Sequence, residues 1–555
     1  MSRIAKFFLK LLLWGLACIL AVALVLATVC VALHATADLD EPEFSPTEGN
    51  AEIVSDSLRR WKDNALRINA EGLWEMTVSG SAFERGEAIG KLAPDLLYIQ
   101  EKAFTDKLFE MVPSKRYRDF LHYFITIFNR RLGQSVPLEY RQEIKGMSAS
   151  CTHEFDDFGN PYERQMQYHS AHDIGHVMQD YMLVGCTSFA AWGKDSEDSS
   201  MIIGRNFDFY MGEDFARNKL ILFEKPDSGY AYVSVTWPGM LGVLSGMNTE
   251  GLTVTINASK LEVPTMSATP ISILTKRILQ YASTIDEAWK IAVEYSTFVS
   301  ESIMVGSVND RGGAIIEMAL YDPAASDSSV TRIVCANHYQ SDLFKDDPVN
   351  VENIRMSDSM HRFRRVEELL DSAGRVSVAS AACILRDMRG EGGKSVGYCN
   401  ELAINQLLAM HSVIFRPEER KIWVSTSPWQ CGKFVCYDLE KVLDSDFSSV
   451  IESVSDEIPE DSFVHSQSFR NVLEFKRMTH VIQKAANLGL PFPDDSLKLY
   501  VSLNPEYYNT YKTLSHYYLS VGRGDEASSC LQKALPLPMK ESERMEIEKQ
   551  LRSCI

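Results

Sequence analysis

A glycine followed by a cysteine is one pair of residues in this chain that could do chemistry. Gly185-Cys186 comes after a helix-like stretch and just before a strand-like run. A thiol can attack the carbonyl that precedes it, and a glycine leaves that carbonyl uncrowded. Breaking this peptide bond would free an α-amino group on Cys186, with a reference pKa of about 7.7–8.0. The amine would then act as general base for its own thiol, so the chemistry needs no catalytic histidine.

Two charged residues stand in an otherwise apolar segment about twenty residues further on, Gly204-Arg205-Asn206-Phe207-Asp208-Phe209. Buried charges are costly unless they are paired. On these residues alone, a purely structural Arg205–Asp208 pair and a pair that serves the thiol are both open. Strand alternation puts the two side chains on opposite faces, so they reach one site only if the strand bulges or turns between them.

One cluster has the spacing of metal ligands. His169, His172 and His176 would share one face of a helix. No second carboxylate motif accompanies them, and hydrolysis by a terminal cysteine requires no metal. We therefore expect a polar helix face here, with neither a bound metal nor a cofactor.

The pattern of the sequence changes at Gly185. Upstream, helical periodicity dominates over residues 55–181, with a strand-like break at 73–78, and the helically spaced Phe120, Phe124 and Phe128 are expected in the core. Downstream, strands and helices come in blocks, which predicts α+β layers rather than an alternating βαβ sheet. The predicted strands are 201–209, 219–223, 230–236, 251–257, 303–308, 314–318, 331–336, 412–415, 421–426 and 433–438, and the predicted helices of this part are 271–281, 285–295 and one through 360–370.

The end of the chain is helical again. Residues 453–465 are acidic, contain Pro459 and are predicted to be a linker. A helix follows, and Tyr511, Leu514, Ala527 and Leu531 then fit the spacing of one tetratricopeptide-like hairpin. A single repeat cannot stack into a solenoid, so we expect a helical appendage packed on the body.

Taken in order, these segments resemble the cysteine N-terminal-nucleophile (Ntn) hydrolases, in the branch of penicillin acyltransferase and choloylglycine hydrolase. Cys186 matches the nucleophile, and residues 204–208 match the Gly-Arg-Asn-x-Asp segment. Gly246-Met247-Asn248-Thr249-Glu250-Gly251-Leu252 matches a Gly-Met-Asn-x-x-Gly-Leu turn that leads into a strand ending at Asn257. Asn337 follows a strand where the family has a second site asparagine, and Arg362-Phe363 resembles its later Arg-Phe. Residues 140–147 resemble the penicillin acyltransferase propeptide, and the resemblance covers about residues 70–440.

The resemblance implies a four-layer αββα fold and self-cleavage between Gly185 and Cys186. It implies that Cys186 is nucleophile and base, that Asp208 holds the α-ammonium, and that Arg205 favours the thiolate or holds the acyl group. Asn257 would donate to the oxyanion, and Asn337 and Arg362 would complete the polar wall. Bile salt hydrolases lose only a short leader, so the long N-terminal segment places this chain nearer the acyltransferases.

Composition and the N-terminus define the compartment. The chain of 555 residues has a net charge of −19, and an acidic surface does not attract nucleic acid. Residues 11–33 carry no charge and follow Arg3, Lys6 and Lys10, which predicts a signal anchor with the body outside the cytoplasmic membrane, periplasmic if the cell is Gram-negative. A cleaved signal peptide, ending at Ala35-Thr36-Ala37, is the alternative.

The predicted organisation is therefore as follows: 1–37 signal anchor or signal peptide, 38–54 tether, 55–185 helical N-terminal segment, 186–450 catalytic domain, and 466–555 helical C-terminal region. The predicted activity is hydrolysis of a linear amide of an N-acyl substrate, such as an N-acyl amino acid or a lipid-like amide, through an acyl-cysteine intermediate. Transfer of the acyl group to an amine acceptor, hydrolysis of an ester, and a non-catalytic membrane-anchored interaction protein are the alternatives.

Overall fold

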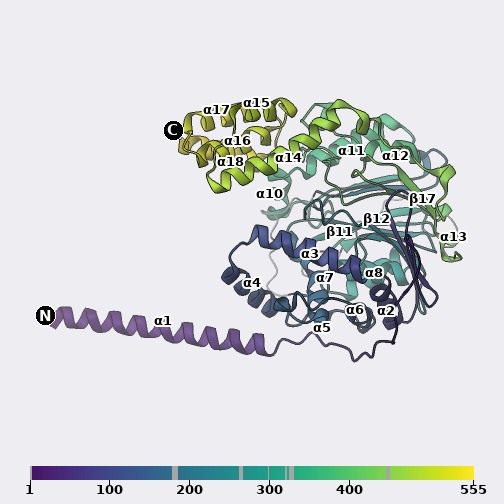
Figure 1. Ribbon diagram of the computed structural model, residues 1–555, viewed down its shortest axis with the longest axis horizontal. Coiled ribbons are helices and arrows are strands. Elements are labelled where there is room, and N and C mark those ends of the chain that lie inside the picture. Colours follow the sequence, from purple (N-terminus) through teal and green to yellow (C-terminus); the bar gives the residue numbers. More distant parts are fainter. Residues whose placement is uncertain are drawn as a thin grey trace.

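Two β-sheets lie face to face at the centre of the molecule (Figure 1). The computed structural model describes residues 3–177, 185–209, 211–261, 267–297, 299–318, 322–323, 330–445 and 451–554. The strands of the larger sheet are β1 (Glu52–Ser55), β2 (Leu58–Trp61), β3 (Asn64–Ile68), β4 (Trp74–Gly80), β7 (Leu220–Pro226), β8 (Tyr232–Thr236), β9 (Ser245–Asn248), β10 (Leu252–Ala258), β11 (Glu301–Ser307), β12 (Gly312–Glu317) and β13 (Asp322–Pro323). Those of the smaller sheet are β5 (Thr187–Ala191), β6 (Ile202–Phe207), β14 (Arg332–Cys335), β15 (His411–Arg416), β16 (Lys421–Ser425) and β17 (Phe434–Asp438).

The order of the strands brings the two sides of Gly185-Cys186 into one sheet. The larger sheet runs β1-β2-β3-β4-β7-β8-β9-β10-β11-β12-β13 and the smaller runs β14-β5-β6-β15-β16-β17. Among the described pairs of strands, β4 and β7 are parallel and the others are antiparallel. Since β4 precedes the Gly185-Cys186 bond and β7 follows it, backbone hydrogen bonds join the two parts of the chain.

Helices cover the outer face of each sheet, which gives four layers. On the larger sheet lie α2 (Ala82–Leu92), α6 (Leu138–Ser148), α8 (Ile271–Tyr281) and α9 (Ile285–Glu294), and on the smaller lie α11 (Ser359–Ala373) and α12 (Val378–Leu385). The space between the sheets is filled by apolar side chains of both, including Ile221, Val233 and Met247 from the larger and Ile203, Val413 and Val424 from the smaller. The predicted α+β fold with αββα layers is confirmed.

The N-terminal part contains more strand than its sequence indicates. The prediction of helical structure from residue 55 is wrong at its start, because β1, β2 and β3 extend the larger sheet before the predicted strand β4. These strands have only four or five residues each, which is too short for a clear apolar alternation, and every residue of β1 is exposed. The predicted helices follow as α3 (Pro94–Met111), α4 (Lys115–Phe128), α5 (Leu132–Ser135) and α7 (Pro161–Val177), while residues 178–181 of the predicted range lie outside the described residues.

Helix α4 corrects the prediction for its three phenylalanines. Phe120 is 61% exposed and Phe124 is 57% exposed, so neither belongs to the core. Phe128, at the end of α4, packs against the apolar cluster that contains Cys186. The helical spacing is real, but no described part of the chain covers the face that carries Phe120 and Phe124.

After Gly185 the predicted elements are found in the predicted order. The ten predicted strands correspond to β6, β7, β8, β10, β11, β12, β14, β15, β16 and β17, and the predicted helices to α8, α9 and α11. Strand β9 was not predicted, because its residues lie in the Gly246–Leu252 segment that the sequence presents as a turn. Two further short helices are α10 (Pro348–Met356) and α13 (Leu439–Leu443).

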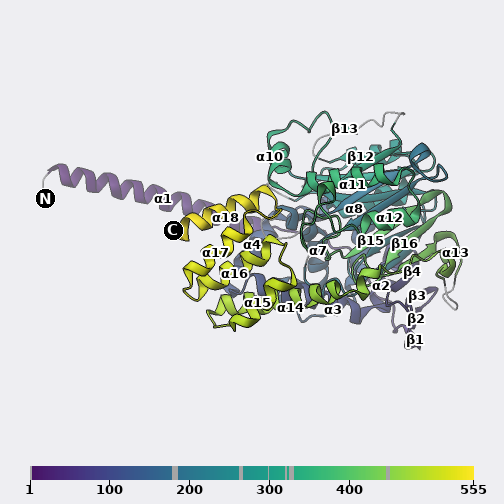
Figure 2. The same ribbon diagram turned by 90° about the horizontal axis from the view of Figure 1, so that it is seen from above.

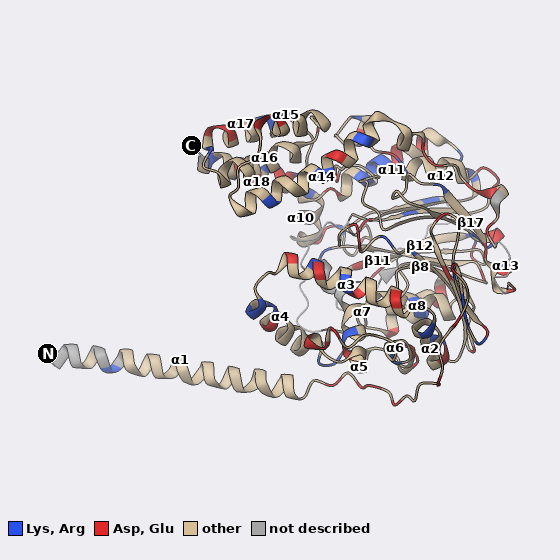
Figure 3. Cartoon of the chain, viewed as in Figure 1, with Lys and Arg blue, Asp and Glu red and all other residues tan. Residues whose placement is uncertain are grey.

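The N-terminal helix α1 (Arg3–Ala35) projects from the body and is tan along most of its length in the charge colouring (Figure 3). Its residues Leu12–Ala35 are long and apolar enough to cross a membrane, and none of the span is buried. The following segment lies against the body. The Leu39 carbonyl accepts from the Tyr162 hydroxyl at 3.1 Å, and the Thr47 hydroxyl donates to Glu87 at 2.9 Å.

The C-terminal helices form a separate layer beside the two-sheet body (Figure 2). They are α14 (Gln467–Leu488), α15 (Asp494–Leu503), α16 (Tyr508–Ser520), α17 (Gly524–Ala534) and α18 (Glu541–Cys554). The Tyr508 hydroxyl donates to Glu401 at 2.6 Å, and the Asn504 amide donates to the Tyr398 carbonyl at 2.9 Å. These bonds fix the helices on residues 398–401, close in sequence to the loop that reaches Gly185.

Candidate active site

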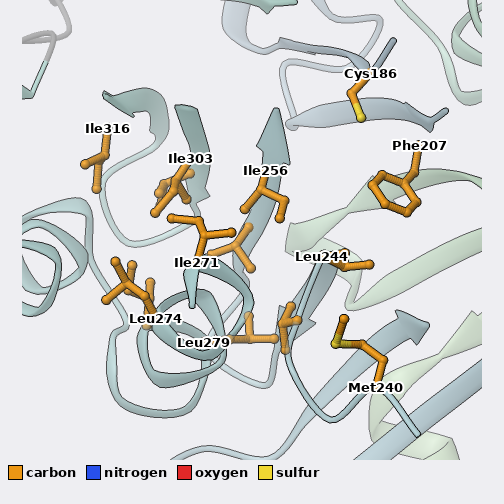
Figure 4. Close-up of a cluster of buried hydrophobic side chains, with 14 of the residues drawn as sticks. Cys186, Phe207, Met240, Leu244, Ile256, Ile271, Leu274, Leu279, Ile303 and Ile316 are labelled. Atoms are coloured by element: carbon orange, nitrogen blue, oxygen red, sulfur yellow. The ribbon is translucent and has the colours of Figure 1, made fainter. Parts of the chain in front are cut away.

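Cys186 lies immediately before β5 and faces the space between the sheets. Side chains of β5 alternate, so that Phe189 packs against the outer helices and Ala190 packs between the sheets. Cys186 shares the parity of Ala190, is 1% exposed, and directs its sulfur into an apolar cluster toward Phe207 (Figure 4). Burial raises the pKa of the thiol to about 11, so the sulfur is protonated at neutral pH.

The peptide bond between Gly185 and Cys186 is held on both sides. The Gly185 N–H donates to the Asp208 carbonyl at 3.0 Å. The Gly185 carbonyl accepts from Nε2 of Gln406 at 3.3 Å. The Cys186 carbonyl accepts from Nη1 of Arg362 at 2.6 Å. The bond that the sequence predicts to break is therefore fixed by three other residues.

Arg205 points between the sheets from the middle of β6. Its Nη2 lies 3.7 Å from the Cys186 sulfur and also donates to the Ile256 carbonyl. Its Nη1 donates to the Ser245 hydroxyl and lies 3.3 Å from Nε2 of His411. Burial lowers the pKa of Arg205 below its ordinary value. A positive charge at this distance acts to lower the pKa of the Cys186 thiol.

Asp208 follows the end of β6 at Phe207, so strand alternation no longer fixes its direction. The side chains of Arg205 and Asp208 can therefore both reach Cys186. The alternation of the strand predicted this only if the strand turned between the two residues. Asp208 is fully buried, and in the part of the chain that the structure describes neither of its carboxylate oxygens has a hydrogen-bond partner. Burial raises its pKa to about 8, against the attraction of Arg362 and Arg205.

Asn257 lies on the inner face of β10 and is fully buried. Its Oδ1 accepts from the Ser188 hydroxyl at 2.8 Å, and its Nδ2 donates to the Cys335 carbonyl at 3.0 Å. An amide nitrogen carries two hydrogens, so one of them is left for an oxyanion. Ser188 and Cys335 are register partners on β5 and β14, and they hold the amide beside the strand that Cys186 precedes.

Asn337 and Arg362 are joined to each other. Nη2 of Arg362 donates to Oδ1 of Asn337 at 2.7 Å and to Asp358 at 3.0 Å. Nδ2 of Asn337 donates to the Ala258 carbonyl at 2.8 Å, next to Asn257 in β10. The structure thus brings all six predicted site residues around one buried centre.

Motif residues without a predicted role support the strands that carry this centre. Nδ2 of Asn206 donates to the Leu385 carbonyl at 2.8 Å, which ties β6 to α12. Nδ2 of Asn248 donates to the Leu279 carbonyl at 2.8 Å, and its Oδ1 accepts from the Leu252 N–H at 2.9 Å. The Gly-Met-Asn segment is thereby held against α8, and β10 follows in register.

Of the three clustered histidines, His169 is the one whose side chain the structure describes. Within them no group of three His, Cys, Asp or Glu side chains is arranged to hold a metal. Nδ1 of His169 contacts the Gln165 carbonyl at 2.7 Å, and its Nε2 accepts from the Leu241 N–H at 3.0 Å, so both ring nitrogens are engaged. Burial lowers the pKa of His169 to about 4. The side chains of His172 and His176 lie outside the described residues.

Sequence reasoning missed three residues of the site. Gln406 contacts the Gly185 carbonyl, and Ser245 and His411 contact Arg205. Burial lowers the pKa of His411 well below its ordinary value, so this imidazole is neutral. Ser245 directly precedes the Gly-Met-Asn motif, which is a usable signal, whereas nothing in the sequence distinguishes Gln406 or His411 from other polar residues.

The fold and the site together define the architecture of an Ntn hydrolase, with the cysteine at the start of an inner strand. Residues 194–427 match the family model described as "Acyl-coenzyme A:6-aminopenicillanic acid acyl-transferase". The matched range contains Arg205, Asp208, Asn257, Asn337 and Arg362 and begins after Cys186. The resemblance predicted from the motifs is confirmed over this range, and it supports an enzyme of amide hydrolysis or acyl transfer.

Similarity to individual proteins is distant. A curated protein of Archaeoglobus fulgidus, described as uncharacterized, is 25% identical over 336 residues, which are 53% of this chain and 54% of that protein. The chain thus matches about half the length of this relative. Among solved structures, a Caenorhabditis elegans ortholog of N-acylethanolamine-hydrolyzing acid amidase is 19% identical, with a TM-score of 0.30 and coverage of 42% of this chain and 93% of that chain. Penicillin V acylase from Agrobacterium tumefaciens is 12% identical, with a TM-score of 0.29 and coverage of 46% and 87%.

Proposed function

We propose that this protein is a self-processing cysteine amidase, which cleaves its own chain between Gly185 and Cys186 and then hydrolyses a linear amide of an N-acyl substrate. In both reactions the Cys186 sulfur attacks a carbonyl carbon and an amine leaves. Water then opens the resulting thioester. Cys186 is the nucleophile, and after self-cleavage its α-amine takes the thiol proton.

The observation that carries this proposal is the unpartnered carboxylate of Asp208. A fully buried carboxylate without a hydrogen bond is costly, and burial raises its pKa to about 8. Cleavage before Cys186 would create an ammonium group close to this carboxylate, since the Gly185 N–H already contacts the Asp208 carbonyl. The cationic partner that Asp208 lacks is thus the product of the proposed cleavage.

The other site residues have roles in the same chemistry. Arg205, 3.7 Å from the sulfur, would favour the thiolate. Asn257 would donate its remaining N–H to the substrate oxyanion. Asn337 and Arg362 would complete the polar wall, with Arg362 holding the Cys186 backbone. None of these steps requires a metal or another cofactor.

The surroundings of the sulfur favour an apolar acyl group. The cluster around Cys186 contains Phe207, Phe209, Phe215 and Trp237. The rings of Phe209 and Trp237 are stacked with centroids 6.3 Å apart. Such a wall fits a hydrocarbon or aromatic acyl chain better than a charged one. Acyl transfer to an amine acceptor is the second candidate, favoured by the matched acyl-transferase family model.

We also propose the location and the division of the chain. Helix α1 would anchor the protein with its body outside the cytoplasmic membrane. Residues 55–185 would form the N-terminal fragment, 186–450 the catalytic domain and 466–555 a helical appendage. The anchor and the nucleophile would then belong to different fragments after cleavage.

The test is made on the full-length chain in detergent. We expect two bands on a denaturing gel, the larger beginning at Cys186 by N-terminal sequencing, and a single band for Cys186→Ala. Cys436→Ala is the matched control, because it removes another buried thiol from the same sheet, on β17, and should leave cleavage unchanged. A wild-type chain that stays whole under all conditions would contradict self-processing. An acyl-amide panel with and without an amine acceptor separates hydrolysis from transfer, since transfer yields a new amide.

A further inference from the structure

Gln406 is the one side chain among the described residues that donates to the carbonyl of Gly185. It lies in the loop between α12 and β15, is 2% exposed, and its Nε2 is 3.3 Å from the Gly185 oxygen. The fit between the two residues is close. A Cβ atom placed on Gly185 would lie 2.4 Å from Nε2 of Gln406, so a larger residue at position 185 would displace this donor.

The residues on both sides of Gln406 are fixed by hydrogen bonds. Oδ1 of Asn405 accepts from the Leu407 N–H at 2.9 Å, which closes a tight turn around Gln406. Leu407 has a φ of 55°, a left-handed conformation that a leucine adopts only where its surroundings hold it. Its carbonyl accepts from Nζ of Lys476 at 2.6 Å. Since Lys476 lies in α14, the C-terminal helices hold the turn that presents Gln406.

We propose that Gln406 is a catalytic residue of self-cleavage, which donates its Nε2–H to the oxyanion that forms on Gly185. This proposal rests on the function proposed above. Sγ of Cys186 forms a bond to the Gly185 carbonyl carbon, and the π electrons of that carbonyl move to its oxygen, where Gln406 donates. The carbon–nitrogen bond then breaks, and the thiol proton goes to the departing Cys186 nitrogen. Water adds to the thioester, returns a proton to the sulfur and leaves Gly185 as a carboxylic acid.

The geometry supports a donor that acts in the transition state. A hydrogen bond of 3.3 Å to a neutral carbonyl is long, whereas an oxyanion draws its donors to about 2.7–3.1 Å. In this structure Nδ2 of Asn257 donates one of its two hydrogens to the Cys335 carbonyl, whereas Nε2 of Gln406 donates to the Gly185 carbonyl itself. Loss of one oxyanion donor typically slows a reaction about 10²–10³-fold. We expect a loss of this size in the rate of self-cleavage when Gln406 is removed.

The test follows cleavage of the full-length chain over time after cell-free synthesis with detergent. Gln406→Leu keeps the size of the side chain and removes the donor, so cleavage should slow about 10²–10³-fold. Gln406→Glu should be slow near neutral pH and recover as the pH falls, because only the protonated carboxyl carries an O–H donor. Gln430→Leu is the matched control and should cleave at the wild-type rate. Gln430 is also buried, and within the described residues its amide has no hydrogen-bond partner.

Each outcome decides between the two proposals. If the wild-type chain stays whole, the proposed function itself fails. If the wild type is cleaved and Gln406→Leu is cleaved equally fast, only the role of Gln406 fails. The role of Gln406 would also be overturned if Gln406→Leu is cleaved slowly and the cleavage rate of Gln406→Glu does not recover at low pH. A glutamine with only a structural role predicts no such recovery. Equal unfolding midpoints of both variants and the parent in the uncut Cys186→Ala chain would show that folding is unaffected.

Discussion

At the scale of single residues, the uncut site is in a resting charge state. Burial raises the pKa of the Cys186 thiol to about 11 and that of the Asp208 carboxyl to about 8, so both groups hold their protons at neutral pH. Arg205 and Arg362 are buried cations beside them, and Arg205 contacts the sulfur. A new ammonium on Cys186 would return Asp208 to its ionised form, because an adjacent positive charge lowers the pKa of a carboxyl. Self-cleavage would thus activate the site chemically.

The raised pKa of Asp208 predicts a pH-dependent stability of the uncut chain. The pKa of Asp208 in the folded chain, about 8, exceeds the pKa of an aspartate in the unfolded chain. The stability that this carboxyl contributes is therefore fully present below about pH 4 and is lost as the pH rises through about 8. In the Cys186→Ala background, Asp208→Asn should therefore become more stable than its parent as the pH rises from 4 to 8. The gain should be on the order of a few kcal/mol, measured by urea unfolding of both chains at each pH. A difference that does not change with pH would contradict a buried, neutral Asp208.

Asn257 is predicted to act on the substrate oxyanion in the mature enzyme. Asn257→Ala should lower kcat about 10²–10³-fold and change KM little, because the oxyanion exists only in the transition state. Rates are taken per cleaved chain, with the cleaved fraction read from a denaturing gel. Asn309→Ala is the control, since this exposed asparagine donates to the Ser283 carbonyl on the surface. A large rise in KM at unchanged kcat would assign Asn257 to substrate binding.

At the scale of elements, four buried charges join helices from both sides of the proposed cut. Arg85 of α2 and Glu143 of α6 come from the N-terminal part, whereas Glu224 of β7 and Lys276 of α8 come from the catalytic part. Nζ of Lys276 lies 2.6 Å from Glu143 and 3.1 Å from Glu224, and Arg85 lies 2.9 Å from Glu143. Burial raises the pKa of Glu224 to about 7. Although burial acts to raise the pKa of Glu143 too, Lys276 and Arg85 hold it below its ordinary value.

Removing one cation from this buried group should be strongly destabilising. Lys276→Met leaves two carboxylates facing Arg85 alone, and breaking a buried pair in this way typically costs about 3–5 kcal/mol. Lys290→Met is the matched control, because the Lys290–Asp286 pair on α9 is exposed, and such pairs contribute about 0–1 kcal/mol. Both are measured by urea unfolding of the uncut Cys186→Ala chain. Equal losses in the two variants would show that the buried group does not hold the helices together.

At the scale of the whole molecule, the sequence predicted the strands in which apolar and polar residues alternate and which end in turns that contain glycine. It predicted Cys186, Arg205, Asp208 and Asn257 as one site because their motifs occur in a specific order. It could not predict Gln406, because this residue reaches Gly185 only through a turn held by distant side chains. Nor could periodicity show the short strands β1 to β3 at one end of the larger sheet or the exposure of Phe120, since neither depends on the pattern of one segment alone.

The parallel pairing of β4 with β7 would hold the two fragments together after the proposed cut. Seven register pairs join the strands from Trp74–Leu220 to Gly80–Pro226, so the sheet continues across the boundary between the fragments. The apolar cluster under α2 likewise combines Met76 with Leu222. Separating the fragments would expose this core, and we therefore expect them to stay together after cleavage.

This arrangement predicts how the fragments divide between membrane and solution. In membranes from cells that make the full-length chain, both fragments should remain in the pellet after a high-salt wash, because backbone pairing and apolar packing hold fragment 186–555 to fragment 1–185. A urea wash that unfolds the body should release fragment 186–555 alone, since α1 belongs to the other fragment. The Cys186→Ala chain is the control and should stay in the pellet whole under both washes. Release of 186–555 by salt would contradict the shared core, whereas both fragments in the soluble fraction before any wash would identify α1 as a cleaved signal peptide.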